Sequence, residues 1–330
     1  MRVFVKFMFF LCLATLFVSG CGNSPAPSSP ENAQTSSSST TTSKPVVALV
    51  MKSLANEFFQ TMENGARAHQ RAHADEYELI AVGTKDELDV NKQVQLVEQM
   101  IAQKANAIVI APADSKTLVG VCKRAQDAGI VVVNIDNRFD SDALAERQLK
   151  IPFVGPDNRK GARLAGEYLA KHLHPGDPVA IIEGVPTTFN AQQRKLGFED
   201  AMQAAGMQIV SSQTANWEMD RASQVVAALI TEKPEIKAFL CANDSMALGA
   251  VSALRAANRL QDVYVVGFDN ISAVQDLLKK GEILATVDQH ADQLAVYGIE
   301  YALEMIKSGA TPEDRETPVD LITAETLGTP

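Results

Sequence analysis

Amide, carboxylate, guanidinium and aromatic side chains follow the short apolar runs of this sequence, at the points where buried strands would end. Planar Asp, Asn, Gln and Arg groups can each hold adjacent hydroxyl groups through paired hydrogen bonds, and aromatic faces cover the apolar C–H patches of a sugar ring. Such a pocket rejects ligands that lack hydroxyls, because its polar groups would stay unpaired. The residues concerned are Asn56, Glu57, Phe58, Phe59, Asp136, Asn137, Arg138, Thr187, Thr188, Asn190, Arg194, Asn216, Trp217, Asn243, Asp244, Asp269, Asn270, Asp288 and Gln289.

Each of these residues also has a purely structural interpretation. Asn and Asp after a strand are common turn residues and helix caps, and Phe58 with Phe59 could form a hydrophobic staple and core pair. Trp217, the only tryptophan, lies in the polar context ANWEMD, where a ligand platform and surface packing are equally compatible with the sequence. His69 and His73 are four residues apart, but their polar neighbours favour a solvated helix face over a metal site.

Nine short apolar runs alternate with amphipathic helical stretches from residue 46 onward. Continuous Val and Ile runs favour strands that are buried on both faces, and their alternation with helices predicts parallel sheets covered on both sides. Nine such units exceed one compact sheet, so we expect two sheets of five or six strands, with the ligand at the carboxyl ends of the strands. The strands are expected at 46–51, 77–82, 107–111, 130–135, 179–184, 207–212, 236–242, 263–268 and 283–288. The helices are expected at 57–74, 89–104, 115–128, 158–173, 191–205, 220–232, 244–258, 271–280 and 291–308.

The first twenty residues have the composition of an export signal. Arg2 and Lys6 precede the apolar run 7–18, which is too short to span a bilayer. The segment Val18-Ser19-Gly20-Cys21 resembles the bacterial lipoprotein signal, in which cleavage leaves cysteine as the first residue. By that resemblance Cys21 would carry a thioether-linked lipid. The alternative is an ordinary signal peptide that ends near a cysteine.

Residues 21–44 are rich in Ser, Thr and Pro and almost free of apolar side chains. Such a segment buries too little surface to offset the entropy of ordering it, and it is typical of a disordered tether. We therefore expect the folded part to begin near Lys44. The remaining length suffices for two lobes with separate cores.

The charge of the chain argues against some classes of binding partner, and its cysteine content bears on disulfide and metal sites. Removing residues 1–20 takes away two positive charges and no negative ones, so the formal charge moves from −10 to −12. An acidic chain of this kind argues against binding to nucleic acid or to a membrane through a basic surface. Beyond Cys21 only Cys122 and Cys241 remain, without CxxC spacing or a nearby His. A disulfide between them is compatible with an oxidising compartment, but their apolar contexts favour buried free thiols.

The sequence contains none of the common catalytic motifs: no GxSxG, GxxxxGK[ST], HExxH or strand-linked GxGxxG. Neither a metal nor a cofactor is predicted, and we expect no enzyme activity. Carboxylates do converge on the presumed cleft, so residue types alone leave a sugar hydrolase open.

The strand ends, taken in order, resemble the periplasmic ribose-binding class of solute-binding proteins over about residues 45–325. The matching segments are ANEFF, NID, FVGPDNRKGARLAGEYLA, QQRKLGF, ANDSMALG, VGFD and ATVDQ. The ligand domains of lactose-repressor-type proteins share two of them, ANDxMALG and VGFD. Those repressors carry an N-terminal helix-turn-helix where this chain has a signal peptide and a tether, which favours the transport class.

The resemblance implies a fold of two doubly wound parallel-sheet lobes joined by a three-strand hinge, the periplasmic binding protein type I architecture. It assigns 45–156 plus 290–318 to the N-terminal lobe and 157–289 plus 319–330 to the C-terminal lobe. The chain should cross between the lobes near 155–158, 288–291 and 317–320.

The resemblance also implies a set of ligand-binding residues, with a sugar ring held between Phe58/Phe59 and Trp217. Two departures argue against ribose itself: Asn137 replaces a frequent Arg, and Trp217 replaces a smaller aromatic. Glu57 also stands where proline is frequent. Another pentose, a hexose or a sugar alcohol is therefore at least as compatible with the sequence. The implied ligand residues are Asn56, Phe58, Phe59, Asp136, Asn137, Arg194, Trp217, Asn243, Asp269 and Gln289.

The function implied is that of a monomeric, extracytoplasmic receptor that closes over a monosaccharide or sugar alcohol and delivers it to an ABC permease. It would be held by its lipid in the periplasm or on the outer face of the cytoplasmic membrane. The alternative is a sugar-sensing receptor coupled to a chemoreceptor or kinase, because its binding chemistry would be the same.

Overall fold

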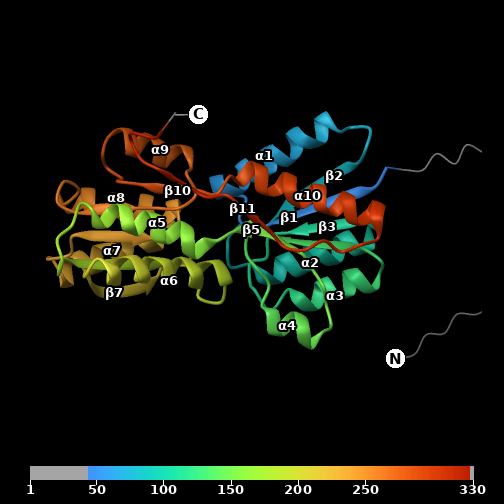
Figure 1. Ribbon diagram of the computed structural model, residues 1–330, viewed down its shortest axis with the longest axis horizontal. Helices are drawn as coiled ribbons and strands as arrows, with labels where there is room; N and C mark the ends of the chain where they lie inside the picture. The colour runs from blue at the N-terminus through green and yellow to red at the C-terminus, as the bar shows by residue number, and fades with distance from the viewer. Residues whose placement is uncertain (1–43, 328–330) are drawn as a thin grey trace, which may run out of the picture. The chain divides into compact units, whose positions relative to one another are not determined.

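The computed structural model describes residues 44–327, which form two α/β lobes (Figure 1). The first lobe has a six-stranded parallel sheet in the order β11-β5-β4-β3-β1-β2. Its strands are β1 (Val46–Met51), β2 (Glu78–Gly83), β3 (Ala107–Ile110), β4 (Val131–Ile135), β5 (Phe153–Pro156) and β11 (Arg315–Thr317). Its helices are α1 (Glu57–Ala72), α2 (Val90–Ala102), α3 (Val119–Asp127), α4 (Ser141–Glu146) and α10 (Ala291–Ser308).

The second lobe has a four-stranded parallel sheet in the order β7-β6-β8-β9. A separate antiparallel pair, β10 and β12, lies beside it through one bridge between Val266 and Ala285. Its strands are β6 (Pro178–Glu183), β7 (Gln208–Thr214), β8 (Ala238–Cys241), β9 (Tyr264–Val266), β10 (Thr286–Asp288) and β12 (Asp320–Ile322). Its helices are α5 (Asn158–Ala170), α6 (Phe189–Ala204), α7 (Met219–Glu232), α8 (Asp244–Ala256) and α9 (Ser272–Lys279).

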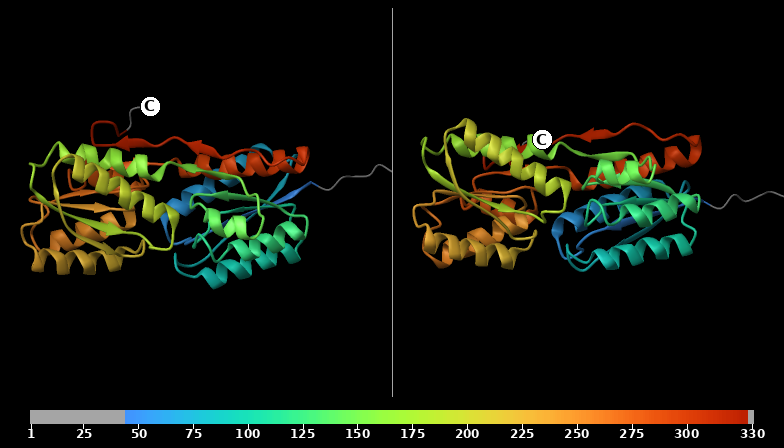
Figure 2. Two further views of the ribbon diagram at one scale, coloured as in Figure 1. Left: turned by 60° about the horizontal axis from the view of Figure 1, so that its bottom comes forward. Right: turned by 90° about the horizontal axis from the view of Figure 1, so that it is seen from below.

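The alternation of side chains along β1 explains why helices cover both faces of the first sheet. Val47 and Leu49 belong to the same buried cluster as residues of α1 and α10. Ala48 and Val50 point the other way and join a cluster with residues of α2 and α3. The views in Figures 1 and 2 show these helix pairs on opposite sides of the strands. All four β1 side chains are fully buried, as expected for a central parallel strand.

The chain passes between the two sheets three times, from β5 to α5, from β10 to α10 and from β11 to β12. The predicted two-lobed α/β fold is confirmed, and each predicted strand and helix overlaps an observed one. The prediction of five or six strands per sheet is wrong for the second lobe, whose parallel sheet has four. Within residues 44–327, no helix is both long and apolar enough to cross a membrane.

Candidate ligand-binding site

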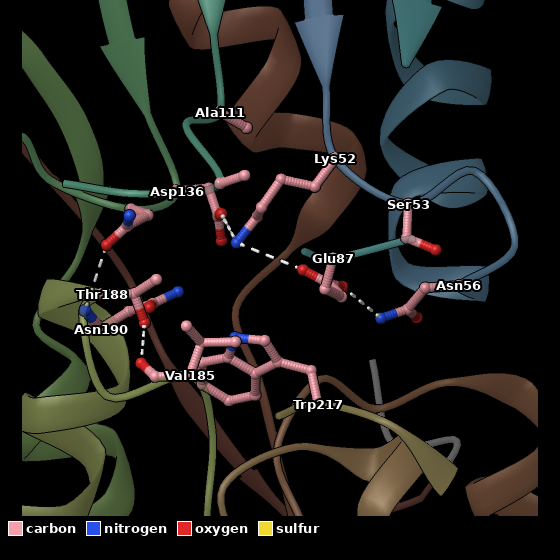
Figure 3. A network of polar contacts seen from close by, with 12 residues as sticks. Lys52, Ser53, Asn56, Glu87, Ala111, Asp136, Val185, Thr188, Asn190 and Trp217 are labelled. Atoms are coloured by element: carbon pink, nitrogen blue, oxygen red, sulfur yellow. Dashed lines mark hydrogen bonds and ion pairs between the residues drawn. The ribbon is translucent and has the colours of Figure 1, made fainter. Parts of the chain in front are cut away.

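A small cavity lies between the two lobes, at the carboxyl ends of their strands. Both lobes supply its walls, which combine charged, amide and aromatic side chains. Part of this wall is drawn in Figure 3, where Lys52, Glu87 and Asp136 face Trp217. The lining residues are Lys52, Asn56, Phe58, Phe59, Glu87, Asp136, Asn190, Arg194, Trp217, Asn243, Asp269 and Gln289.

Nine of the ten ligand residues expected from the sequence line this cavity, and Asn137 does not. The Asn137 side chain is fully buried. Its Nδ2 donates to the carbonyl of Pro112 at 3.0 Å, and its Oδ1 accepts from the Ser115 hydroxyl and the Asn190 amide, both at 3.3 Å. Asp136 has a left-handed backbone (φ 61°), so the chain turns sharply between the two residues. Asn137 therefore joins the first lobe to the start of α6 instead of facing the cavity.

Lys52 and Glu87 are cavity residues that the sequence analysis missed. Lys52 follows β1 directly, and its Nζ lies 2.9 Å from Asp136 Oδ2 and 3.7 Å from Glu87 Oε2. All three side chains are at most 5% exposed. Burial by itself lowers the pKa of Lys52, but the charges of Asp136 and Glu87 outweigh it and raise this pKa. Burial raises the pKa of Glu87, against the opposing charge of Lys52. A lone lysine after a strand is the signal that could have revealed this group.

Asn56 connects this first-lobe cluster to α1. Its Oδ1 accepts a hydrogen bond from the Phe58 amide at 3.0 Å, which caps the helix. Its Nδ2 donates to Glu87 Oε1 at 3.3 Å. The same cap places the rings of Phe58 and Phe59 edge to face, with centroids 5.0 Å apart, in the cavity wall. These residues therefore form the start of α1 and also line the cavity.

Arg194 is the centre of the polar wall on the second lobe. It comes from α6, is 2% exposed, and donates to Asn158 Oδ1 at 2.7 Å and to the Ala242 carbonyl at 2.8 Å. Its Nη1 lies 3.4 Å from Asp269 Oδ1, and its guanidinium stacks 3.7 Å above the Phe268 ring. Burial lowers the pKa of Arg194 although Asp269 opposes the shift.

Asp269 occupies the same wall and carries a strongly perturbed carboxyl group. Its Oδ1 accepts from Gln289 Nε2 at 2.7 Å. Burial raises the pKa of Asp269 well above its ordinary value, the Arg194 charge opposes this, and Asp244 adds to it. Arg194, Asp269 and Gln289 thus form a hydrogen-bonded group with donors and acceptors on the edge of the cavity.

Three buried polar atoms in the wall have no hydrogen-bond partner among residues 44–327. Asp136 Oδ2 is one of them, but it is ion-paired with Lys52 at 2.9 Å. The other two are Trp217 Nε1, a donor, and Gln289 Oε1, an acceptor, and both lack any charged partner. An unpaired buried polar group costs roughly 1–3 kcal/mol. A hydroxylated ligand can satisfy both atoms, since each hydroxyl donates and accepts.

The position of the Trp217 ring is fixed by its surroundings. Asn216 and Trp217 both have positive φ angles, 54° and 70°, and the side chain is 5% exposed. The ring packs directly on Gly184, where an added Cβ would lie 2.2 Å from a ring carbon. A Trp held in an unfavourable backbone conformation against a glycine is consistent with a placement required by function.

The two lobes also contact each other directly. Glu57 Oε1 accepts from the amide of Ser272 at 2.8 Å, and the Phe189 amide donates to Ser115 Oγ at 3.0 Å. These bonds join the N-terminal ends of α1 and α9. Together with the Asn137–Asn190 contact, they also join the loops before α3 and after β4 to the N-terminal end of α6. The structure therefore has the two lobes engaged around the cavity.

Of the remaining predicted residues, Cys122 and Cys241 are free, buried thiols in different lobes, and burial raises the pKa of Cys122 to about 12. Cys21, the predicted lipid attachment site, lies outside the described residues.

Comparison with known proteins places this architecture in a family. A model described as "Periplasmic binding protein domain" matches residues 47–311. A D-ribose/D-allose-binding protein of Pseudomonas aeruginosa is 60% identical over 86% of this chain and 90% of its own length. A D-apiose import binding protein of Paraburkholderia graminis is 34% identical over 86% and 88%.

Solved structures agree with these matches. An ABC transporter solute-binding protein from Burkholderia multivorans is 58% identical, with a TM-score of 0.84 over 85% of this chain and 99% of that one. One from Actinobacillus succinogenes, with bound D-allose, is 35% identical, with a TM-score of 0.81 over 86% and 98%. The resemblance inferred from the strand-end motifs is thus confirmed, and the chain belongs to the periplasmic binding protein family, whose relatives here are sugar-binding proteins of ABC transporters.

Proposed function

We propose that this protein captures a monosaccharide or sugar alcohol between its lobes and delivers it to the permease of an ABC importer. The observation that carries the proposal is the cavity wall. Charged groups from both lobes converge there with the unpaired Trp217 Nε1 and Gln289 Oε1. These groups match the hydroxyl pattern of a small sugar, and the Phe58, Phe59 and Trp217 rings suit its apolar faces.

The similar proteins narrow the class of sugar. Relatives with 30% identity or more are named for D-ribose, D-allose and D-apiose, and the Actinobacillus structure holds D-allose. These are aldoses of five or six carbons with several adjacent hydroxyl groups. We therefore propose an aldopentose or aldohexose as the ligand, with D-ribose and D-allose as the first to test.

Binding would operate by hinge closure. Three chain segments connect the lobes near 156–158, 288–291 and 317–320, so bending of these few residues can open the cavity while each lobe stays rigid. We assign 45–156 plus 290–318 to one moving lobe and 157–289 plus 319–330 to the other. Ligand contacts made by both lobes bias the equilibrium toward the closed state, which is the form that the permease would recognise.

The proposal places the mature protein outside the cytoplasm as a monomer, anchored through a lipid on Cys21. The export signal, the adjacent cysteine and the membership of a periplasmic binding protein family support this location. The chain would act by binding alone. The carboxylates of Asp136 and Asp269 are each engaged by a buried cation, Lys52 and Arg194, as suits a recognition site.

Calorimetry on residues 22–330 tests the proposal directly. D-Ribose, D-allose, D-apiose and myo-inositol are titrated into the protein. At least one aldose should bind with a dissociation constant well below the millimolar range. The variant Arg194→Met should abolish the heat of the same titration. The variant Arg159→Met, which changes an exposed arginine, is the control and should retain it. If no sugar of the panel binds below millimolar concentration, the proposed function is wrong.

A further inference from the structure

Asp244 lies behind the second-lobe wall of the cavity and contacts the loop that carries Asp269. We propose that Asp244 is a positioning residue, which holds loop 267–271 so that the Asp269 carboxylate faces the ligand. This inference rests on the proposed function. Asp244 is 0% exposed and does not line the cavity, so it acts through Asp269 and makes no contact with the ligand itself.

The contacts of Asp244 join three elements. Its Oδ2 accepts from the Ile271 amide at 3.0 Å, and its Oδ1 accepts from the Thr286 hydroxyl at 2.7 Å. Its own backbone amide donates to the Phe268 carbonyl at 2.8 Å. One residue at the start of α8 therefore fixes both ends of the loop and ties it to β10. Because β10 ends at Asp288, directly before Gln289, these hydrogen bonds also help to fix the backbone that carries Gln289. We call this set of hydrogen bonds from Asp244 the brace.

The loop needs such a brace because its backbone is strained. Asp269 has φ 125° and Asn270 has φ 56°, values that residues with a Cβ rarely adopt. Gly267 permits the close approach of the carboxylate, since an added Cβ there would lie 2.1 Å from Asp244 Oδ1. Without external hydrogen bonds the loop would relax and turn the Asp269 side chain away from Arg194 and Gln289.

A simple capping role does not account for the Asp244 carboxylate. Asn243 already caps α8, because its Oδ1 accepts from the Met246 amide at 2.9 Å. The two Asp244 oxygens are instead directed at Ile271 and Thr286, outside the helix. Both bonds are buried, where each contributes more than it would at the surface.

The electrostatic environment of Asp244 supports its connection to the site. Burial raises the pKa of Asp244 to about 7, against the hydrogen bonds from Thr286, Ile271 and Phe268 and the charge of Arg194. The ionised carboxylate repels that of Asp269 and adds to the raised pKa of that group. The carboxyl groups of Asp244 and Asp269 therefore both interact with the positive charge of Arg194, although only Asp269 lines the cavity.

Two variants test the brace without touching the cavity wall. Asp244→Asn leaves one oxygen for two donors. Thr286→Val removes the donor to the other carboxylate oxygen with little change of shape, together with the long contact of 3.4 Å from the Asn270 amide to the same hydroxyl. We expect the affinity for the bound sugar, probed with D-ribose and D-allose, to fall roughly tenfold in the first and threefold or more in the second. Asp276→Asn, on the exposed side of α9, is the matched control and should bind like the wild type.

A double-mutant cycle with Asp269→Asn distinguishes positioning from general stabilisation. If Asp244 acts through Asp269, Asp244→Asn should cost little further affinity in the Asp269→Asn background. Amide hydrogen exchange gives a readout without sugar: residues 267–271 should exchange faster in Asp244→Asn and Thr286→Val than in Asp276→Asn.

The inference is overturned if both variants bind sugar within twofold of the wild type, if the cost of Asp244→Asn is the same in both backgrounds, or if exchange in the loop is unchanged. Should Asp244→Asn not fold, Thr286→Val alone decides the matter. If the wild-type protein binds no sugar of the panel, the proposed function is contradicted instead. The hydrogen-exchange measurement would still show whether Asp244 holds loop 267–271.

Discussion

Both lobes bring a buried cation and its carboxylates to the cavity, but they hold the cation in different ways. Lys52 in the first lobe is held by charge, at 2.9 Å from Asp136 and 3.7 Å from Glu87. Arg194 in the second lobe is held by geometry, through directed hydrogen bonds and a stack 3.7 Å above Phe268. Lys52 therefore has fewer directed contacts than Arg194, although its Nζ also lies 5.3 Å from the centroid of the Phe59 ring.

The chemistry of the two cations explains this difference. An ammonium is a compact charge on a flexible stem, while a guanidinium is planar and presents its donors in a fixed fork. Burial lowers the pKa of both cations, and neighbouring carboxylates raise it; the carboxylates outweigh burial at Lys52 but not at Arg194. We expect the second lobe to orient the sugar and the first lobe to adapt its polar contacts to it.

The largest effect should come from replacing Arg194 by Met. Asp269 would stay buried without its cation, and Asn158 and the Ala242 carbonyl would lose their donor. The free energy of unfolding should fall by about 3–5 kcal/mol, and sugar binding should disappear. Urea denaturation and calorimetry measure the two quantities. Arg159→Met, which breaks only the exposed pair with Asp200, is the control and should change neither; equal effects of both variants would contradict a special role for the buried guanidinium.

Replacing Lys52 by Met should cost less, about 2–4 kcal/mol of unfolding free energy, through the two carboxylates left buried together. Because this cluster is held by charge, adding Asp136→Asn should restore about half of the loss. The corresponding double change in the second lobe, Arg194→Met with Asp269→Asn, should restore little, since stacking and directed hydrogen bonds stay lost. Urea denaturation of the four variants decides this, and equal recovery in both lobes would remove the distinction drawn between them.

The long, periodic elements of both lobes could be predicted from the sequence, and the short ones could not. The missed strands β11 and β12 have three residues each, RET and DLI, and β5 is FVGP, which contains two strand breakers. These strands form because they pair with partners far along the chain, such as β11 with β5. The alternation of apolar and polar residues within three or four positions does not predict such pairing. The second parallel sheet has fewer strands than expected because β10 pairs with β12 in a separate antiparallel sheet.

The cavity wall was predictable where residue type and strand end coincided. Lys52 was missed because a lysine is seldom buried unless it is paired, and its partners Glu87 and Asp136 are distant in sequence. Asn137 was expected in the wall because it follows Asp136, but the positive φ of Asp136 turns the next side chain away. Both errors concern the first lobe, whose polar group depends on tertiary neighbours more than on position along a strand.

Removing the Trp217 ring should weaken sugar binding by roughly 1–3 kcal/mol, because a stacking face of the second lobe is lost. Gly184→Ala should weaken binding as well, since its Cβ would displace the ring without removing any polar group. Calorimetry with the best sugar of the panel measures both variants. Gly120→Ala, where an added Cβ meets nothing within 4 Å, is the control. Unchanged affinity in Trp217→Ala would assign the ring a packing role only.

The second lobe should also dominate the pH dependence of stability. The pKa of Asp244 is raised from an ordinary 3.8 to about 7, so between these values the folded protein keeps a proton that the unfolded chain has released. The free energy of unfolding should therefore fall as pH rises from 5 to 8, by roughly 2–3 kcal/mol from this group. Urea denaturation at several pH values measures the slope, which Asp244→Asn should flatten. A slope that survives this change would have its origin in Asp269, whose pKa burial also raises well above its ordinary value, or in Glu87 of the first lobe.

The smallest effect is expected where the lobes touch, at Glu57. Its carboxylate accepts from the amide of Ser272 at 2.8 Å and lies at the N-terminus of α9, where the helix dipole favours a negative charge. Glu57→Gln keeps an acceptor but loses the charge, so the closed state should open faster and the dissociation rate of the sugar should rise roughly two- to threefold. Stopped-flow dissociation measures this rate.

The Glu57 effect should shrink at high salt, because the contact is partly exposed and screened. Glu63→Gln is the matched control: it lies on the same helix, pairs only with Arg67 in its own lobe, and should leave dissociation unchanged. If both variants dissociate alike, the contact follows closure without stabilising it. The lifetime of the closed state would then depend on the contacts that the cavity wall makes with the sugar, among them those of the two cation groups.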